Sequence, residues 1–184
     1  MLKSDQTILV VVDIQGRLSR LVADREMLVK NVCGLIEGCQ VLGVPAVYTE
    51  QIPEKMGSTD PEIEKKLVDL KPVAKNSFSC CGEPRFMNRL TALGRKQILL
   101  CGIEAHICVA QTGLDLLAEG YEVHLVTDAI SSRESSQTKL TAERLSQAGS
   151  VLTSMEMALY ELQKAAGGDS FKRILDIVKK AAVS

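Results

Sequence analysis

Short apolar runs rich in β-branched residues alternate along this chain with longer segments in which apolar residues recur at helical spacing. A continuous apolar run is typical of a strand that is buried on both faces of a parallel sheet. The predicted strands are Thr7–Val12, Val44–Tyr48, Pro72–Lys75, Gln97–Gly102, Glu122–Thr127 and Ser150–Thr153. The predicted helices are Asp24–Leu42, Glu83–Leu93, Cys108–Glu119, Ser135–Ala148, Ser154–Ala165 and Ser170–Ala182, with Pro61–Leu67 as a short helix or turn. This alternation predicts an α/β fold, a three-layer α/β/α sandwich around a mostly parallel, Rossmann-like sheet of about six strands.

Length and composition favour a single domain over residues 1–184, because the chain contains no repeat, low-complexity segment or linker. Hydrophobic residues make up 46% of the chain, but aromatic residues only 3%, and Trp is missing. The core must therefore be built from aliphatic side chains and Met. No apolar run approaches the length of a membrane span, and Met1–Asp5 does not resemble a signal peptide, so we expect no membrane partner.

Charge and cysteine usage narrow the function classes further. A formal net charge of −1, without blocks of like charge, argues against nucleic acid as the main partner. The six Cys form no C-x2-C pair and the chain has only two His, which argues against a structural zinc site. Only Gly16 follows the first strand closely, too little for a phosphate cradle, so we expect no nucleotide and no other cofactor. Unpaired thiols favour a cytoplasmic, reducing location.

Three residues at the ends of predicted strands carry groups suited to one reaction. Asp13 follows the first strand, Lys75 ends the third, and Cys108 lies in the first turn of the helix after the fourth. Ligands of such folds bind beyond the carboxyl ends of the strands, so we expect these side chains to face one crevice. The helix N-terminus and the Lys75 ammonium should lower the pKa of the Cys108 thiol, and Asp13 is placed to act as its base.

Each of these residues also has a purely structural interpretation. A carboxylate after a first strand often caps a helix, and a Lys at a strand end is usually solvated. A Cys in the first turn of a helix is often just a small buried residue. The combination of the three is more specific than any one of them.

Three segments resemble the signature segments of the isochorismatase-like cysteine hydrolases. They are "VVVDIQ" (Val10–Gln15), Lys75 and "GIEAHICVAQT" (Gly102–Thr112), and "VTDAISSR" (Val126–Arg133) is a weaker fourth match. The resemblance covers about residues 5–165 and keeps the order and spacing of the segments. The whole chain is similar to the small isochorismatase-domain proteins.

The resemblance implies an Asp13–Lys75–Cys108 catalytic triad and a cis peptide bond before Glu104. The backbone N–H groups of Glu104 and Cys108 would then form an oxyanion hole. The implied activity is hydrolysis of a C–N bond in a small amide- or urea-type substrate through a Cys108 thioester, with Asp13 as acid and base. Related nicotinamidases hold a metal with an Asp and several His after the second strand. The corresponding "YTEQIPEKMG" (Tyr48–Gly57) has no His, so we expect no catalytic metal.

Gln15, Phe78 and His106 are weaker candidates for the substrate pocket. His106 is two residues from Cys108, and residues two apart on a helix point in different directions. We therefore expect His106 at the pocket edge or in helix packing rather than as a catalytic partner. Phe78 follows Lys75 in a loop, where an aromatic ring either walls a planar substrate or packs inward.

Other polar and sulfur-containing residues are predicted to serve the fold. His124 lies within a predicted strand, where a half-buried structural role is favoured. Asp128 is expected to brace the turn after its strand, with Arg133 as a candidate partner. The adjacent Cys80 and Cys81 either line the pocket or fill a tight loop, and the loop is favoured. Neighbouring cysteines rarely form a disulfide with each other.

Two alternative functions are considered beside the hydrolase. A haloacid-dehalogenase-type phosphatase needs a second acid two residues after Asp13, and Gln15 occupies that place. A catalytically silent interaction protein on the same fold stays open. We also expect a homo-oligomer, a dimer or higher, because the C-terminal helix carries an apolar stripe that could pack on its own sheet or on a neighbour. That stripe contains Phe171, Ile174, Leu175 and Val178.

Overall fold

A computed structural model describes residues 1–182, so the last two residues of the predicted domain lie outside the described residues. Within that range the chain forms one sheet of six strands, all parallel, in the order β3-β2-β1-β4-β5-β6. The strands are β1 (Thr7–Val12), β2 (Ala46–Gln51), β3 (Val73–Lys75), β4 (Gln97–Gly102), β5 (Glu122–Ile130) and β6 (Val151–Thr153). The predicted parallel sheet is therefore confirmed.

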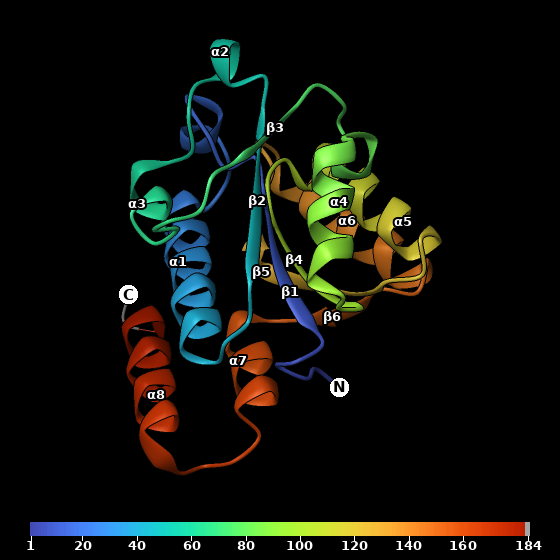
Figure 1. Cartoon of the computed structure of the whole chain (residues 1–184). Helices are drawn as coiled ribbons and strands as arrows, with labels where there is room; N and C mark the ends of the chain where they lie inside the picture. The colour runs from blue at the N-terminus through green and yellow to red at the C-terminus, as the bar shows by residue number, and fades with distance from the viewer. Residues whose placement is uncertain (183–184) are drawn as a thin grey trace.

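Helices cover both faces of the sheet, which confirms the predicted three-layer sandwich (Figure 1). One face is covered by α1 (Arg25–Val41) and α7 (Met155–Gln163), and the other by α4 (Pro84–Leu93), α5 (Ala110–Ala118) and α6 (Ser135–Gln147). The short helices α2 (Pro53–Met56) and α3 (Pro61–Glu64) belong to the connection between β2 and β3. The remaining helical turns are Leu18–Arg20, Cys80–Gly82 and the π-helical turn Ala105–Val109.

The apolar core is divided into two clusters by the sheet. All six residues of β1 are buried, and successive side chains point to opposite faces, as the pleat of a strand requires. Leu9 and Val11 join the cluster with α1 and α7, whereas Ile8 and Val10 join the cluster with α4 and α5. This burial on both faces explains why the sequence of β1 is continuously apolar rather than alternating.

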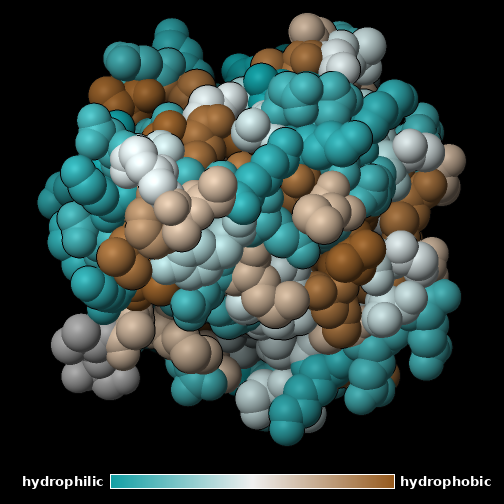
Figure 2. All heavy atoms as spheres, turned by 90° about the horizontal axis from the view of Figure 1, so that it is seen from below, coloured by the Kyte–Doolittle hydropathy of each residue, from teal (hydrophilic) through white to brown (hydrophobic). Residues whose placement is uncertain are grey.

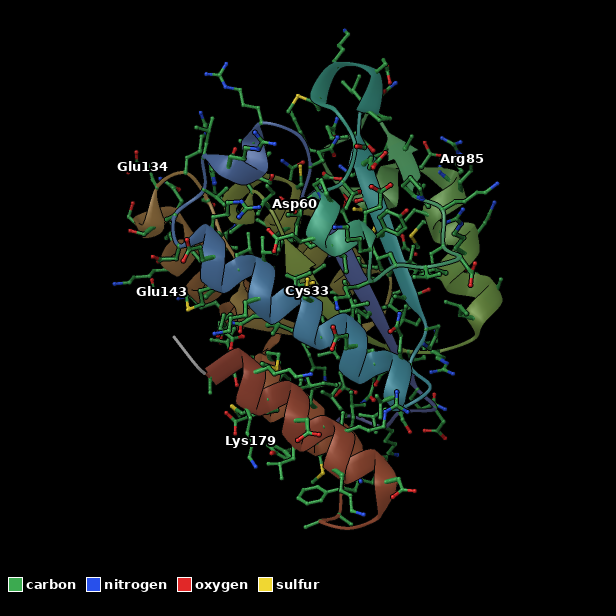
Figure 3. The ribbon with its side chains drawn as sticks, turned by 90° about the vertical axis from the view of Figure 1, so that its left-hand side faces the viewer. Cys33, Asp60, Arg85, Glu134, Glu143 and Lys179 are labelled. Atoms are coloured by element: carbon green, nitrogen blue, oxygen red, sulfur yellow. The ribbon has the colours of Figure 1, made fainter. Side chains whose placement is uncertain are left out.

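The last helix, α8 (Gly168–Ala182), packs on α1 of its own chain rather than on the sheet. Figure 3 shows α8 lying alongside α1, and Ile174, Ile177 and Val178 are the buried residues of α8. The alternative of a neighbouring chain under this stripe is therefore not needed to bury it. No helix within residues 1–182 has both the length and the apolar character to cross a bilayer.

Two strands extend further than the sequence pattern indicated. β2 continues past Tyr48 because Thr49 and Gln51 pair with Val73 and Lys75 of the edge strand β3. β5 continues past Thr127, since its pairing with β4 resumes after an irregularity. The carboxyl ends of the strands lie at the upper end of the molecule in Figure 1. Figure 2 shows the opposite end, where a largely hydrophilic surface is interrupted by scattered apolar groups.

Candidate active site

Asp13 directly follows β1 and is buried, with 4% of its surface exposed. Its backbone is left-handed, with φ 49°, a conformation that Asp tolerates better than most residues. The carboxylate accepts a hydrogen bond at Oδ1 from the Thr49 hydroxyl at 2.7 Å. Its other oxygen, Oδ2, lies 2.6 Å from the Lys75 ammonium. The two carboxylate oxygens of Asp13 therefore have different environments.

Lys75 is the last residue of β3, and its side chain is completely buried. Its Nζ donates to Gln51 Oε1 at 2.6 Å, to the Phe78 carbonyl at 3.0 Å and to the Ser77 carbonyl at 3.1 Å. An ammonium has three protons, and these three acceptors match them in number. Asp13 supplies the counter-charge that a buried ammonium requires. Lys75 is thus held as a fixed cation beside the carboxylate.

Cys108 lies in the π-helical turn between β4 and α5, not in the first turn of an α-helix as predicted. Its thiol lies beside the Asp13 carboxylate, and the pKa of the thiol is raised to about 12. Burial is the largest cause, followed by the negative charge of Asp13, while Lys75 acts in the opposite direction. The expected lowering of this pKa is therefore wrong. Loss of solvent around the thiolate outweighs the nearby ammonium.

The structure thus brings Asp13, Lys75 and Cys108 together from three separate strand ends. Asp13 contacts both of the others and is the centre of the cluster. Burial and the negative charge of Asp13 oppose deprotonation of Cys108 in this structure.

Cys80 also lies beside this cluster, closer to the pocket-lining alternative than to the favoured role in a loop. It is fully buried in the turn Cys80–Gly82, and its Sγ lies 3.7 Å from the Thr49 hydroxyl. Thr49 uses its one proton for the Asp13 carboxylate, so Cys80 is the donor in this contact. The Cys80 backbone N–H donates to Thr112 Oγ1 at 2.9 Å, which fixes the turn against α5. Cys80 supports the site rather than merely filling a loop.

The peptide bond between Ile103 and Glu104 is cis, as the resemblance implied. On either side of Glu104 the backbone is fixed by hydrogen bonds: Ile103 N–H donates to the Val12 carbonyl at 2.9 Å, and Ala105 N–H to the Ser131 carbonyl at 2.8 Å. Among the residues that the structure describes, none accepts a hydrogen bond from the Glu104 N–H itself. This amide is therefore available as a donor to a bound group.

The Glu104 side chain is held from the segment that follows β5. Arg133 donates to Glu104 Oε1 from Nε at 2.9 Å and from its backbone N–H at 3.3 Å. The predicted partnership of Arg133 with Asp128 is therefore wrong. Asp128 is instead part of β5 and accepts a hydrogen bond from the backbone N–H of Met155, the first residue of α7, at 2.8 Å. It braces a helix start on the other side of its strand.

The weaker pocket candidates occupy three different places. Gln15 is buried, and its amide is used within the protein: Nε2 donates to the Gly57 and Gln51 carbonyls, and Oε1 accepts from Gln51 N–H. Phe78 is 55% exposed, so its ring is not packed into the core, and it lies three residues past Lys75. Their roles toward a substrate stay predictions.

His106 lies in the π-helical turn, with Nδ1 at 3.0 Å from the Ser132 hydroxyl. This contact directs the imidazole toward the segment after β5. The other histidine, His124, is buried in β5 and lies 2.7 Å from Glu122 Oε1 through Nε2, which agrees with a structural role.

The loop after β2 covers the region where the sequence showed no metal ligands of the expected kind. Thr59 of this loop donates from its N–H and its hydroxyl to the Glu50 carboxylate on β2, both at 2.7 Å. Within residues 1–182, no three His, Cys, Asp or Glu side chains are grouped as a metal site would require. Asp60, labelled in Figure 3, holds the same loop by its ion pair with Arg25 at 2.8 Å.

Cavity size does not identify the reactive site. A cavity of about 910 Å3 lies between α1, α7 and α8 and is lined by Asn31, Asp128 and Glu156 among others. Its lining residues include no thiol or hydroxyl group. The Asp13–Lys75–Cys108 cluster is the candidate site, because it brings a thiol, a carboxylate and an ammonium together.

Comparison with known proteins identifies the family of the chain. A family model described as the Isochorismatase domain matches residues 7–157 of the chain. The chain belongs to the isochorismatase family. It is therefore part of the isochorismatase-like hydrolase superfamily that the three sequence segments resemble, and the matched range contains all three residues of the cluster.

Relatives of this isochorismatase-family chain cover nearly its whole length. The secreted isochorismatase effector Isc1 of Phytophthora sojae is 38% identical over 179 residues, which cover 95% of this chain and 85% of the relative. The structure of the MAR1 ribonuclease from Caenorhabditis elegans superposes with a TM-score of 0.92 at 30% identity, over 100% of this chain and 94% of the other. The YcaC gene product of Escherichia coli, an octameric hydrolase of unknown specificity, shares the fold with a TM-score of 0.92 at 24% identity, over 98% and 90% of the two chains.

Proposed function

We propose that this protein is a cysteine-dependent hydrolase that cleaves a C–N bond of a small amide- or urea-type substrate. The observation that carries this proposal is the buried contact of Asp13 with both the Lys75 ammonium and the Cys108 thiol. A nucleophile, a proton acceptor and a fixed cation within one cluster are the groups that acyl transfer to a thiol requires.

The first half of the reaction forms a thioester. Asp13 takes the thiol proton as Cys108 Sγ attacks the substrate carbonyl, which avoids a free thiolate whose formation burial opposes. The carbonyl π electrons move to oxygen, and the backbone N–H groups of Glu104 and Cys108 stabilise that oxyanion. Protonated Asp13 then gives its proton to the leaving nitrogen, the C–N bond breaks, and ammonia or an amine leaves.

The second half releases the acid. Asp13, again a carboxylate, takes a proton from water while the water oxygen attacks the thioester carbonyl. Breakdown of the second tetrahedral intermediate expels the Cys108 sulfur, which recovers its proton from Asp13. Lys75 takes no part in these proton transfers: its three hydrogen-bond acceptors and Asp13 fix its Nζ, and it orients the carboxylate.

The assembly and the environment are part of the same proposal. Large apolar side chains are exposed at Leu21, Met27 and Phe78, among other positions, and the Escherichia coli structural neighbour is octameric. Both support a homo-oligomer. All six cysteines are free thiols, and the proposed nucleophile is one of them, which supports a reducing, cytoplasmic environment.

The decisive experiment screens small amides, ureas and hydrazides, with mass detection of an acyl group on Cys108. We expect turnover of at least one class, an acyl adduct on the Cys108 peptide, and loss of both in Cys108→Ala, with Cys33→Ala as the matched control. RNA is included because one structural neighbour is a ribonuclease. Turnover that survives Cys108→Ala, or cleavage of RNA alone, would falsify the thioester mechanism, and inactivity toward every class would favour a silent interaction protein.

A further inference from the structure

The segment that carries the proposed oxyanion donor is docked, residue by residue, on the segment after β5. Glu104, Ala105 and His106 contact Arg133, Ser131 and Ser132, respectively. These contacts combine an ion pair, a backbone hydrogen bond and a side-chain hydrogen bond. Two loops from neighbouring strands are therefore joined at the point where the Glu104 amide is presented.

We propose that Arg133 is a positioning residue for the oxyanion hole, acting through the Glu104 side chain. This inference rests on the proposed hydrolase function. Arg133 does not touch the reacting atoms in it; the guanidinium fixes the residue whose backbone N–H does. The role is specific, because it concerns one amide donor and not the nucleophile or its base.

The first argument is the way the Glu104 carboxylate is held. Only 6% of the Glu104 side chain is exposed, and a buried carboxylate is stable only when it is paired. Arg133 binds one oxygen, Oε1, from two directions: its Nε donates at 2.9 Å and its own backbone N–H at 3.3 Å. Two donors on one oxygen restrict the side chain more than a single contact would.

The second argument is that Arg133 stands on an anchored segment. Ser131 donates from Oγ to the Ala23 carbonyl at 2.6 Å, and Ala23 N–H donates back to the Ser132 carbonyl at 2.9 Å. These bonds tie the segment to the start of α1. The Arg133 side chain itself is 57% exposed, so removing its charge does not empty a core position.

The third argument concerns what remains free at Glu104. Its neighbours Ile103 and Ala105 are hydrogen-bonded through their own N–H groups, whereas the described residues offer no acceptor to the Glu104 N–H. The chain is thus fixed on both sides of an unpaired donor. The Glu104 carbonyl accepts hydrogen bonds from the Ile107 and Val109 N–H groups at 3.1 and 3.3 Å, and Arg133 is the charged partner that holds the Glu104 side chain.

The test compares two reactions of Cys108 that differ in the charge they build. Propanal adds reversibly to the thiol: the S–C bond forms, the C=O π bond opens, and the oxygen takes the thiol proton. The product has the tetrahedral geometry of the hydrolytic intermediate and places an oxygen in the hole. Methyl methanethiosulfonate instead forms an S–S bond and releases methanesulfinate, so it builds no charge on a carbonyl oxygen.

Protection of Cys108 by propanal against methyl methanethiosulfonate, followed by mass spectrometry of the full-length protein, gives the propanal dissociation constant. We expect Arg133→Gln to weaken propanal binding about tenfold and to leave the reaction of the unprotected thiol within about twofold. The expected loss is smaller than the loss of a whole oxyanion donor, because the variant loosens the Glu104 amide and does not remove it. Arg144→Gln, an exposed arginine on α6, is the matched control and should change neither. Arg133→Lys, which keeps the charge but loses the planar Nε donor, should fall between.

The outcomes separate this inference from the proposed function. If propanal protects the wild-type thiol and its dissociation constant is unchanged in Arg133→Gln, the positioning role of Arg133 is overturned and the proposed function is not. A parallel fall of both reactions also overturns it, because the thiol itself would then be disturbed. No protection of the wild-type protein overturns the oxyanion hole and the positioning role together. In a Glu104→Ala background, Arg133→Gln should have no further effect, and an additional loss there would show that Arg133 does not act through Glu104.

Discussion

The Thr49 hydroxyl donates a 2.7 Å hydrogen bond to Oδ1 of Asp13, and both residues are buried. This bond occupies one carboxylate oxygen and leaves Oδ2 beside the Lys75 ammonium. Thr49 thereby sets the orientation in which Asp13 meets the thiol of Cys108. The Thr49 hydroxyl in turn accepts a hydrogen bond from the Cys80 thiol. The orientation of Asp13 therefore depends on β2 and on the turn Cys80–Gly82 as well as on the end of β1.

Thr49→Val is expected to lower the unfolding free energy by about 1–3 kcal/mol, because a buried carboxylate oxygen loses its donor at nearly constant side-chain shape. Turnover should fall as well, since Asp13 is then free to rotate. Thr49→Ser keeps the hydroxyl and is the matched control for both effects. Chemical denaturation and steady-state kinetics check this, and equal stability of the Val and Ser variants would count against it.

The reaction of Cys108 with methyl methanethiosulfonate in the free protein should accelerate with pH without levelling off. The thiol pKa is about 12, so the thiolate fraction grows about tenfold for each pH unit between about pH 7 and 10. A free thiol of pKa about 8.5 levels off within that range and serves as the control compound. A plateau near neutral pH for Cys108 would instead indicate a thiolate–ammonium pair at rest.

The same raised pKa predicts a loss of stability in alkali. The folded protein keeps the Cys108 proton that an unfolded chain, with a thiol pKa of about 8.5, has released. The folded state therefore binds more protons above that pH, and the unfolding free energy falls as pH rises toward 12. Other buried thiols act in the same direction, so the informative measurement compares the unfolding free energy of the wild type with that of Cys108→Ala across this pH range. The unfolding free energy of Cys108→Ala should fall less in alkali than that of the wild type.

Lys75→Met should cost about 3–5 kcal/mol of unfolding free energy, because it leaves Asp13 as a buried charge without its partner. The Gln51 side chain and two backbone carbonyls lose their donor at the same time. Lys172→Met is the control, since Lys172 is 77% exposed and pairs with Asp169 at 3.6 Å on the surface. Urea denaturation compares the two, and similar small changes in both would contradict the buried ion pair.

Gly16→Ala should be more destabilising than Gly43→Ala, although both glycines have positive φ, 54° and 67°. An added Cβ at Gly16 would lie 1.7 Å from the Met56 carbonyl oxygen, whereas at Gly43 it meets nothing within 4 Å. We expect the strain of positive φ in both variants, about 1 kcal/mol, and an additional overpacking cost of about 1–3 kcal/mol at Gly16 alone. Thermal denaturation of the pair isolates the clash, and equal losses would mean that the loop moves aside freely.

The sequence predicted the layers, the parallel sheet and the meeting of Asp13 with Lys75, because carboxyl ends of parallel strands share one edge. It assigned no role to Thr49 or Gln51, since β2 was predicted to end at Tyr48. Their signal was present as consecutive polar residues, but their inclusion in β2 depends on pairing with β3, which a pattern along one strand does not reveal.

The direction of the Cys108 pKa and the partner of Arg133 were mispredicted for a related reason. A helix start and a nearby lysine can be inferred from sequence, whereas the depth of burial and the contact with Asp13 are properties of the packed molecule. Similarly, Arg133 is five residues from Asp128, but the chain between them directs it to Glu104, which is distant in sequence.

The order of the sheet divides the proposed chemistry along the β1–β4 boundary. Proton transfer is assigned to the half that contains β1, β2 and β3, with Asp13, Thr49 and Lys75, while the half that contains β4 and β5 supplies Cys108 and the Glu104 amide. The two halves are kept in register by six paired positions, from Thr7 with Gln97 to Val12 with Gly102. In the proposed mechanism, acid–base behaviour and carbonyl recognition therefore belong to different halves of the sheet, and the central strand pair keeps the sulfur and the carboxylate aligned.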